Sequence, residues 1–199
     1  AELGLADGAF VFGAHGRVLA RKGYLEMIRA ARLARDAMTE DEKAHVAFVL
    51  VGDTPEDIGG DHLAECKELA RELGLERVFH FTGFRGDVRP YVRDFDVAVV
   101  PSVYEDPLPR AVIESMAFGV PVIGTDVGGI GEMLDDGGGC LVPARDERAL
   151  ADAMLRYLRD DALRARDGAR ARERVLREFD ARAHAARIRD EIARAVFDA

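Results

Sequence analysis

The sequence predicts an α/β protein: a Rossmann-like, doubly wound parallel sheet of about six strands, with extra helices at the C-terminal end. Short apolar runs alternate with segments of helical period up to about residue 142. One run, VAFVLV at 46–51, is apolar at every position, as in a strand covered on both faces. From about residue 147 onward only helical patterns remain. We expect a single domain over 1–199, with a helical tail at about 147–199.

The first half of the chain is expected to supply three strands and two long helices. A loop is predicted at 14–23, and 39–44 is expected to be a charged turn. The first helix keeps the helical period, and the second is stopped by Gly74. The predicted strands are 10–13, 46–51 and 78–82, and the predicted helices are 24–38 and 62–73.

The second half is expected to supply three more strands and five helices. A Pro-punctuated acidic loop, 101–109, follows the fourth strand, and a glycine-rich loop, 128–131, follows the fifth. Residues 135–139 are expected to form a turn. The predicted strands are 97–100, 120–124 and 140–142, and the predicted helices are 87–94, 110–118, 147–158, 162–178 and 182–196.

Bulk composition excludes several classes of protein. A formal net charge of -9 argues against a nucleic-acid-binding surface, since contacts to phosphates dominate such binding. No apolar run approaches the ~20 residues of a membrane helix. The first residues show no signal-peptide pattern, and Cys66 and Cys140 are expected to be buried, reduced thiols. These features favour a cytoplasmic protein.

Topology predicts which loops meet. If the strand order is 3-2-1-4-5-6, the order reverses between strands one and four, and ligands bind there at the carboxyl ends of the strands. The loops that follow these two strands are 14–23 and 101–109. They also carry the residue types suited to a site, so we expect them to face each other.

The loop after the first strand offers two cations. Arg17, preceded by Gly16, and Lys22 lie five residues apart and can be directed at one anion. Preorganised cations of this kind can stabilise a diphosphate, on whose oxygens negative charge builds when it departs from a substrate. The alternative is an ordinary surface arginine and a lysine at the start of a helix.

The loop after the fourth strand offers carboxylates. Asp106 and Glu114 are separated by seven residues, and Glu105 is a second candidate for the first acid. Glu114 lies in the first turns of a helix, where a carboxylate can accept hydrogen bonds from a ribose diol and the helix start favours phosphate oxygens. The alternative for Glu114 is a surface acid paired with Arg110 at i,i+4.

Further residues border these loops. Phe84 and Arg85 follow the third strand and are candidate contacts, although a core position for Phe84 is favoured. His15 is a weaker candidate contact, since a lone histidine is more often structural. Gly128 and Gly129 allow a close backbone approach to phosphate or simply a tight turn. The remaining candidate contacts are Gly13, Gly52, Leu108, Pro109 and Ala111.

Two motifs of other enzyme classes are set aside. Asp94-Phe95-Asp96 spells a metal-sugar motif, but it spans a helix end and a strand start, where its acids are expected to cap and to meet solvent. Gly129-Ile130-Gly131 lacks the third glycine of a dinucleotide fingerprint and does not follow the first strand. No cluster has the spacing of metal ligands. We therefore expect neither a metal nor a cofactor.

The two loops together resemble those of retaining glycosyltransferases of the GT-B architecture, family 4 in particular. The shared features are Gly-Arg, four residues and Lys-Gly at 16–23, and the spaced acids after a strand that ends in Pro-Ser. Two positions depart from the family pattern: Asp106 replaces the usual Glu, and Pro109 replaces the usual Gly. The resemblance covers only the C-terminal, donor-binding half of such an enzyme.

The resemblance implies roles for these residues. Arg17 and Lys22 would stabilise the diphosphate, Asp106 would hold hydroxyl groups of the donor sugar, and Glu114 would hold the ribose. The stretch at 83–86, with Phe84 and Arg85, would line the nucleotide base. The donor would be a UDP- or GDP-sugar, and transfer would need no metal. Because the N-terminal acceptor domain is absent, the isolated chain would bind nucleotide but transfer sugar weakly or not at all. That absent domain also leaves peripheral attachment to a membrane open.

Two other functions stay open at this level. The chain can be a nucleotide-sugar-binding module without transfer activity, which the departures at Asp106 and Pro109 would favour. It can also belong to a UDP-sugar epimerase of the same architecture, which would release UDP and form an epimer of the sugar.

Overall fold

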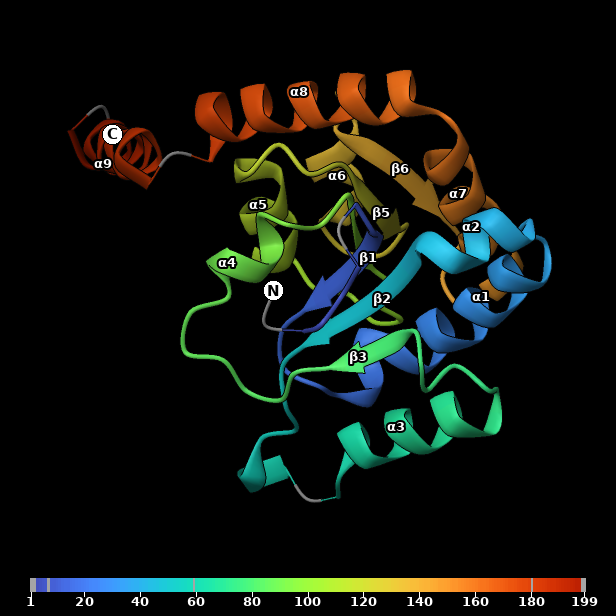
Figure 1. The fold of residues 1–199 in the computed structure, drawn as a ribbon. Coiled ribbons are helices and arrows are strands. Elements are labelled where there is room, and N and C mark those ends of the chain that lie inside the picture. The colour runs from blue at the N-terminus through green and yellow to red at the C-terminus, as the bar shows by residue number, and fades with distance from the viewer. Residues whose placement is uncertain (1–2, 7, 59, 180, 198–199) are drawn as a thin grey trace.

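The computed structural model describes residues 3–6, 8–58, 60–179 and 181–197. Its centre is a parallel sheet of six strands in the order β3-β2-β1-β4-β5-β6, which confirms the predicted topology (Figure 1). The strands are β1 (Phe10–His15), β2 (Val46–Val51), β3 (Phe79–Phe81), β4 (Val97–Val100), β5 (Val122–Thr125) and β6 (Gly139–Val142).

Helices cover both faces of this sheet (Figure 1). Short 3₁₀ turns occupy Ala20–Lys22 and Glu56–Ile58. The helices are α1 (Tyr24–Asp36), α2 (Glu40–His45), α3 (His62–Glu72), α4 (Arg89–Val92), α5 (Arg110–Ala117), α6 (Ile130–Leu134), α7 (Glu147–Arg159), α8 (Asp161–Glu178) and α9 (Ala181–Phe197). None of the helices in the described ranges is long and apolar enough to cross a membrane.

The hydrophobic core forms two clusters, because successive strand residues point to opposite faces. On one face Phe12 and Phe48 join buried residues of α1, α3 and α7. On the other face Val11 and Val49 join buried residues of α5, α6 and α8. The rings of Phe12 and Phe48 stack with their centroids 5.5 Å apart. Two-sided burial explains why the run at 46–51 is apolar throughout.

Several predicted boundaries are wrong. The charged turn at 39–44 is largely helix α2, which begins with a capping box: Thr39 and Glu42 exchange hydrogen bonds between side chain and backbone. The strand predicted at 10–13 continues to His15, because parallel pairing with β2 extends to that residue. The glycine-rich loop predicted at 128–131 ends earlier, since Ile130 begins α6 and is buried.

The segment Asp94-Phe95-Asp96 does more than meet solvent. The Asp96 carboxylate is partly buried and accepts a hydrogen bond of 2.8 Å from the backbone N–H of Val11. Phe95 covers Gly13 so closely that a Cβ there would lie 2.2 Å from the ring. Asp94, which pairs with Arg93 at 3.1 Å, is exposed as predicted. Gly13 therefore serves the packing of β1 beneath Phe95.

The two thiols differ in burial. Cys66 in α3 is free and fully buried, and burial raises its pKa to about 12. Cys140 in β6 is also free but only partly buried, so the prediction of two buried thiols is correct for Cys66 alone. At neutral pH the Cys66 thiol is protonated and therefore unreactive.

Candidate functional site

The loop that follows β1 is tied to the loop that follows β2. The backbone N–H of Gly16 donates to the Val51 carbonyl at 2.9 Å, and that of Val18 donates to the Asp53 carbonyl at 2.8 Å. A Cβ on Gly52 would lie 1.9 Å from the Gly16 carbonyl oxygen, so only glycine permits this approach. Gly52 thus shapes the loop that carries Arg17, whose side chain is exposed.

The same loop contacts the loop that follows β4, as the predicted topology requires. Gly23 adopts a φ of +73°, and a Cβ there would lie 1.8 Å from the carbonyl oxygen of Pro101. The backbone N–H of Val103 donates to the Arg21 carbonyl at 3.0 Å. The expectation that 14–23 and 101–109 face each other is therefore confirmed.

The contact brings Lys22 and Asp106 together. Lys22 Nζ lies 2.6 Å from Asp106 Oδ2, and the two side chains are 19% and 21% exposed. Both residues were predicted for the same site but with different partners, Lys22 for a diphosphate and Asp106 for hydroxyl groups of a sugar. In the structure they are bonded directly to each other. This carboxylate neutralises the charge of Lys22 and therefore opposes the binding of another anion there.

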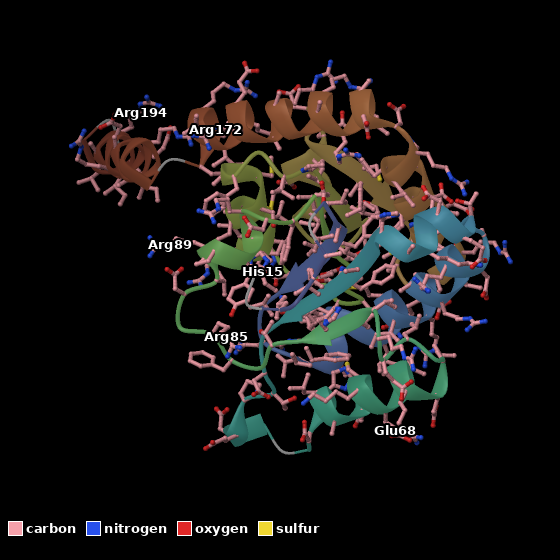
Figure 2. The ribbon with its side chains drawn as sticks, in the orientation of Figure 1. His15, Glu68, Arg85, Arg89, Arg172 and Arg194 are labelled. Carbon is pink, nitrogen blue, oxygen red and sulfur yellow. The ribbon has the colours of Figure 1, made fainter. Side chains whose placement is uncertain are left out.

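A second pair links the end of β1 to helix α5. His15, the last residue of β1, directs its Nε2 at Glu114 Oε2 of α5 at 2.9 Å. The other oxygen of Glu114 lies 3.5 Å from Arg110, so the predicted i,i+4 pair also forms. The hydrogen bond from His15 lowers the pKa of Glu114 despite the opposing effect of partial burial. Figure 2 shows His15 at the end of β1, in the middle of the molecule.

Gly128 and Gly129 support the acidic loop. The N–H of Gly129 donates to the Asp106 carbonyl at 3.0 Å. A Cβ on Gly128 would lie 2.5 Å from the backbone of Asp106, and one on Gly129 would lie 2.0 Å from the Pro107 carbonyl oxygen. The lack of side chains at Gly128 and Gly129 lets the backbone of residues 106–107 pack against them. Neither an approach to phosphate nor a tight turn, the two interpretations from the sequence, included this contact.

The core position favoured for Phe84 is wrong. Its side chain is 75% exposed. Gly83 adopts a φ of +68° and accepts a hydrogen bond of 3.1 Å from the N–H of Gly52, so the chain leaves the sheet before Phe84. The neighbouring Arg85, visible on this loop in Figure 2, donates to the Tyr91 hydroxyl at 2.6 Å. The loop remains beside Gly52 at the carboxyl edge of the sheet.

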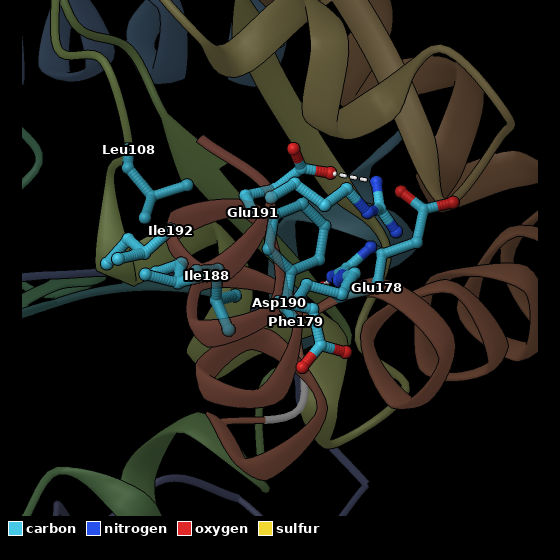
Figure 3. A pocket seen from close by; sticks show the side chains of 10 residues that line it. Leu108, Glu178, Phe179, Ile188, Asp190, Glu191 and Ile192 are labelled. Atoms are coloured by element: carbon cyan, nitrogen blue, oxygen red, sulfur yellow. Dashed lines mark hydrogen bonds and ion pairs between the residues drawn. The ribbon is translucent and has the colours of Figure 1, made fainter. Parts of the chain in front are cut away.

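The remaining candidates lie around the start of α5. Pro109 is buried at its N-cap position, Ala111 is partly buried, and Arg110 and Glu105 are exposed. Leu108 is half-exposed and belongs to a different hollow. That hollow has a volume of about 810 Å³ and lies between the acidic loop and α9 (Figure 3). Its lining includes Leu108, Ile113, Phe179, Ile188 and Ile192, and none of Arg17, Lys22, Asp106 or Glu114.

The loops that follow β1 and β4 share a further contact that was not predicted from the sequence. The guanidinium carbon of Arg21 lies 4.9 Å from the centre of the Tyr104 ring, a cation–π contact. The aromatic residue of Tyr104-Glu105-Asp106 could have suggested it, but only the two acids of this segment were considered. Within the described ranges no group of three or more His, Cys, Asp or Glu residues is placed to hold a metal ion. Chemically, this edge of the sheet offers the exposed Arg17, the pairs Lys22–Asp106 and His15–Glu114, and a start of α5 that no side chain caps.

Similar proteins have this arrangement of elements. The model of the family described as glycosyl transferases group 1 matches residues 9–160. The lipopolysaccharide core biosynthesis glycosyltransferase LpsE of Rhizobium meliloti is 32% identical over 166 residues, which cover 82% of this chain and 44% of that protein. The chain spans less than half the length of the curated relatives it matches.

Solved structures agree in fold. HepE of Anabaena, in complex with UDP and glucose, superposes with a TM-score of 0.80 at 25% identity over 94% of this chain and 48% of that one. The C-terminal domain of a glycosyl transferase group 1 family protein (LpcC) of Francisella tularensis gives a TM-score of 0.74 at 25% identity. That match covers 86% of this chain and 87% of the domain, so the chain is similar to the C-terminal half of such proteins. The chain belongs to the family of glycosyl transferases group 1.

Proposed function

We propose that this chain is the donor-binding domain of a retaining, metal-independent glycosyltransferase that uses a nucleotide-diphosphate sugar. One observation carries the proposal. The carboxyl ends of β1 and β4 bring the loop of Arg17 and Lys22 into contact with the loop of Asp106. The strand order reverses between β1 and β4, and doubly wound sheets bind nucleotides at that point.

Each group has a chemical task in this proposal. Arg17 and Lys22 stabilise the diphosphate as its charge grows, and Glu114 accepts hydrogen bonds from the ribose diol. Removing a preorganised charged group of this kind typically costs roughly 100-fold or more in rate. Asp106 binds hydroxyl groups of the donor sugar once the diphosphate has replaced it at Lys22. The exposed loop of Phe84 and Arg85 borders the base.

Transfer also requires an acceptor. The relatives of this chain are more than twice its matched length, and we propose that a second domain supplies the acceptor site. The chain by itself would then bind the nucleotide and transfer sugar weakly or not at all. Since HepE was solved with UDP and glucose, a UDP-sugar is the first donor to test.

Nucleotide binding tests the proposal directly. Thermal unfolding of the chain would be followed with UDP, GDP, ADP and TDP, each at about 100 times its dissociation constant. Binding at that ratio adds about 2.7 kcal/mol to the free energy of unfolding. The double variant Arg17→Ala/Lys22→Ala should lose the shift. Lys67→Ala/Arg71→Ala on α3 removes the same charge from exposed positions and should keep it. A chain that no nucleoside diphosphate stabilises would contradict the proposal.

A binding module without transfer activity is the second candidate. The direct bond between Lys22 and Asp106 favours it, because a short carboxylate already occupies the lysine. To distinguish the enzyme from the binding module, the acceptor domain of a relative would be added to this chain as a separate polypeptide. Sugar transfer from the donor in that mixture supports the enzyme, whereas binding without transfer or hydrolysis supports the module.

A further inference from the structure

His15 and Glu114 form a pair that the proposed roles leave unexplained. His15 is 6% exposed at the end of β1, and its Nε2 lies 2.9 Å from Glu114 Oε2. Its ring packs beside Phe95, with the two ring centroids 6.4 Å apart. The partners are 99 residues apart in sequence, so the tertiary fold alone creates this bond.

The bond divides the carboxylate of Glu114 into two unlike oxygens. Oε2 faces the buried imidazole, whereas Oε1 faces the exposed Arg110 at 3.5 Å. The Glu114 side chain is 36% exposed, compared with 4% for His15. A carboxylate accepts through both oxygens at once, so Oε1 keeps its capacity to accept from a ligand. His15 Nε2 donates the fixed hydrogen bond.

An exposed glutamate on a helix samples several rotamers, and a hydrogen bond from a buried, immobile ring removes that freedom. The same bond lowers the pKa of Glu114 and so favours the ionised carboxylate against the opposing effect of partial burial. Both effects prepare the carboxylate to accept hydrogen bonds from a pair of hydroxyl groups. Neither effect is needed to fold α5, whose buried face is formed by Val112, Ser115 and Met116.

We propose that His15 is a positioning residue that holds Glu114 for the ribose diol of the nucleotide. The inference rests on the proposed function and extends it, because it assigns the ribose selectivity to the pair and not to Glu114 alone. His15 itself contacts no substrate in this account. The loss of its Nε2 donor should therefore weaken binding only of ligands that carry the diol.

The test compares UDP with 2′,3′-dideoxyuridine diphosphate, which lacks the diol, by calorimetry on the whole chain. If the panel above selects another base, the corresponding pair of nucleotides is used. Wild-type protein should bind the diol-containing nucleotide about tenfold more tightly, which is the usual value of a hydrogen bond to a charged group. In His15→Phe that ratio should fall towards one, while the affinity for the dideoxy nucleotide stays unchanged.

Two conservative variants sharpen the result and replace His15→Phe if it does not fold. The amide nitrogen of Gln reaches the position of Nε2, so His15→Gln should restore the ratio. The amide nitrogen of Asn reaches only the position of Nδ1, so His15→Asn should not. His62, a buried histidine that bonds Glu65 at 2.7 Å at the start of α3, supplies the matched control. His62→Phe should leave the ratio at the wild-type value.

Each outcome separates the inference from the function on which it rests. Equal loss of affinity for both nucleotides in His15→Phe and His15→Asn overturns the inference and leaves a structural role for His15, while the proposed function stands. A wild-type protein that binds both nucleotides equally also overturns the inference, because Glu114 then recognises no diol. A wild-type protein that binds no nucleoside diphosphate overturns the proposed function and the inference with it.

Discussion

At the scale of single residues, the proposed site is built from side chains that already satisfy each other. Lys22 is bonded to Asp106, and Glu114 is bonded to His15. A partly buried charge without a partner costs free energy of folding. These bonds reduce that cost and so allow charged groups at the edge of the sheet. The two pairs differ in consequence. The Asp106 carboxylate repels an anionic ligand at Lys22, whereas a ligand that donates hydrogen bonds can bind Glu114 without displacing His15.

Competition at Lys22 leads to a prediction for Asp106→Asn. The amide cannot hold the ammonium as an ionic partner, so Lys22 becomes available to a diphosphate. The pair is about one-fifth exposed, and such pairs contribute on the order of 1 kcal/mol, which converts to roughly a fivefold change in affinity. We expect UDP to bind Asp106→Asn roughly fivefold more tightly than wild type, as measured by calorimetry at low salt.

Glu105→Asn is the control for that measurement, since it removes the same charge from the neighbouring, exposed position. It should change the affinity for UDP less than Asp106→Asn does. Weaker binding of UDP to Asp106→Asn would show that the aspartate assists the diphosphate and does not compete with it.

At the scale of elements, short helices depend on their ends. Helix α2 has only six residues, and its residues are exposed or partly exposed. Its start is held by the capping box of Thr39 and Glu42, and Glu42 also bonds Arg159 at the end of α7 at 2.8 Å. The arginine and the cap together lower the pKa of Glu42 to about 2. The capping box and the contact with Arg159 therefore stabilise α2, to which burial of side chains contributes little.

Removing the cap should destabilise the protein measurably. Thr39→Ala leaves the backbone N–H of Glu42 without its acceptor, and loss of such a cap typically costs about 1 kcal/mol of unfolding free energy. Urea unfolding, monitored by circular dichroism, measures this change. Thr39→Ser keeps the hydroxyl acceptor and should stay near wild type. Equal stability of Thr39→Ala and wild type would mean that the cap contributes nothing to α2.

At the scale of the whole molecule, the sheet acts as a platform whose interior is apolar and whose carboxyl edge carries the polar groups. A row of aromatic rings crosses three strands, since Phe48 stacks on Phe12 at 5.5 Å and on Phe79 at 5.7 Å. These rings join β1, β2 and β3 on the face covered by α1, α3 and α7. Their packing sets the positions from which the loops of the site begin.

Truncating the central ring should therefore cost far more than truncating an exposed one. Phe48→Ala removes a fully buried ring, and such changes cost about 3–5 kcal/mol. Phe84→Ala removes a ring that is 75% exposed and should change the unfolding free energy by less than about 0.5 kcal/mol. Urea unfolding of both variants tests the pair. Similar costs at the two positions would place Phe84 in the core after all.

Much of the fold follows from local patterns in the sequence. The alternation of apolar strands and helices predicts a parallel sheet with right-handed crossovers, and the structure has the strand order assumed for such a sheet. The contact between the loops after β1 and β4 follows from that order. Residue type, position in the loops after β1 and β4, and the family resemblance together selected Arg17, Lys22, Asp106 and Glu114. Helix α2 was missed because its signal is a cap and not an apolar face, although Thr39 and Glu42 have the spacing of a capping box.

Other features depended on the tertiary structure. Strand β1 reaches His15 because its partner β2 continues to Val51, and this extension buries the imidazole against Glu114. Which cation meets which acid, Lys22 with Asp106, is a contact over 84 residues that no local pattern contains. Gly23, Gly52 and Gly129 are needed because backbone from distant segments comes within reach of a Cβ. The sequence by itself determined the sheet, its order and the residues of the candidate site, since these depend on periodicity and residue type. Only packing between distant segments decided how those residues are paired.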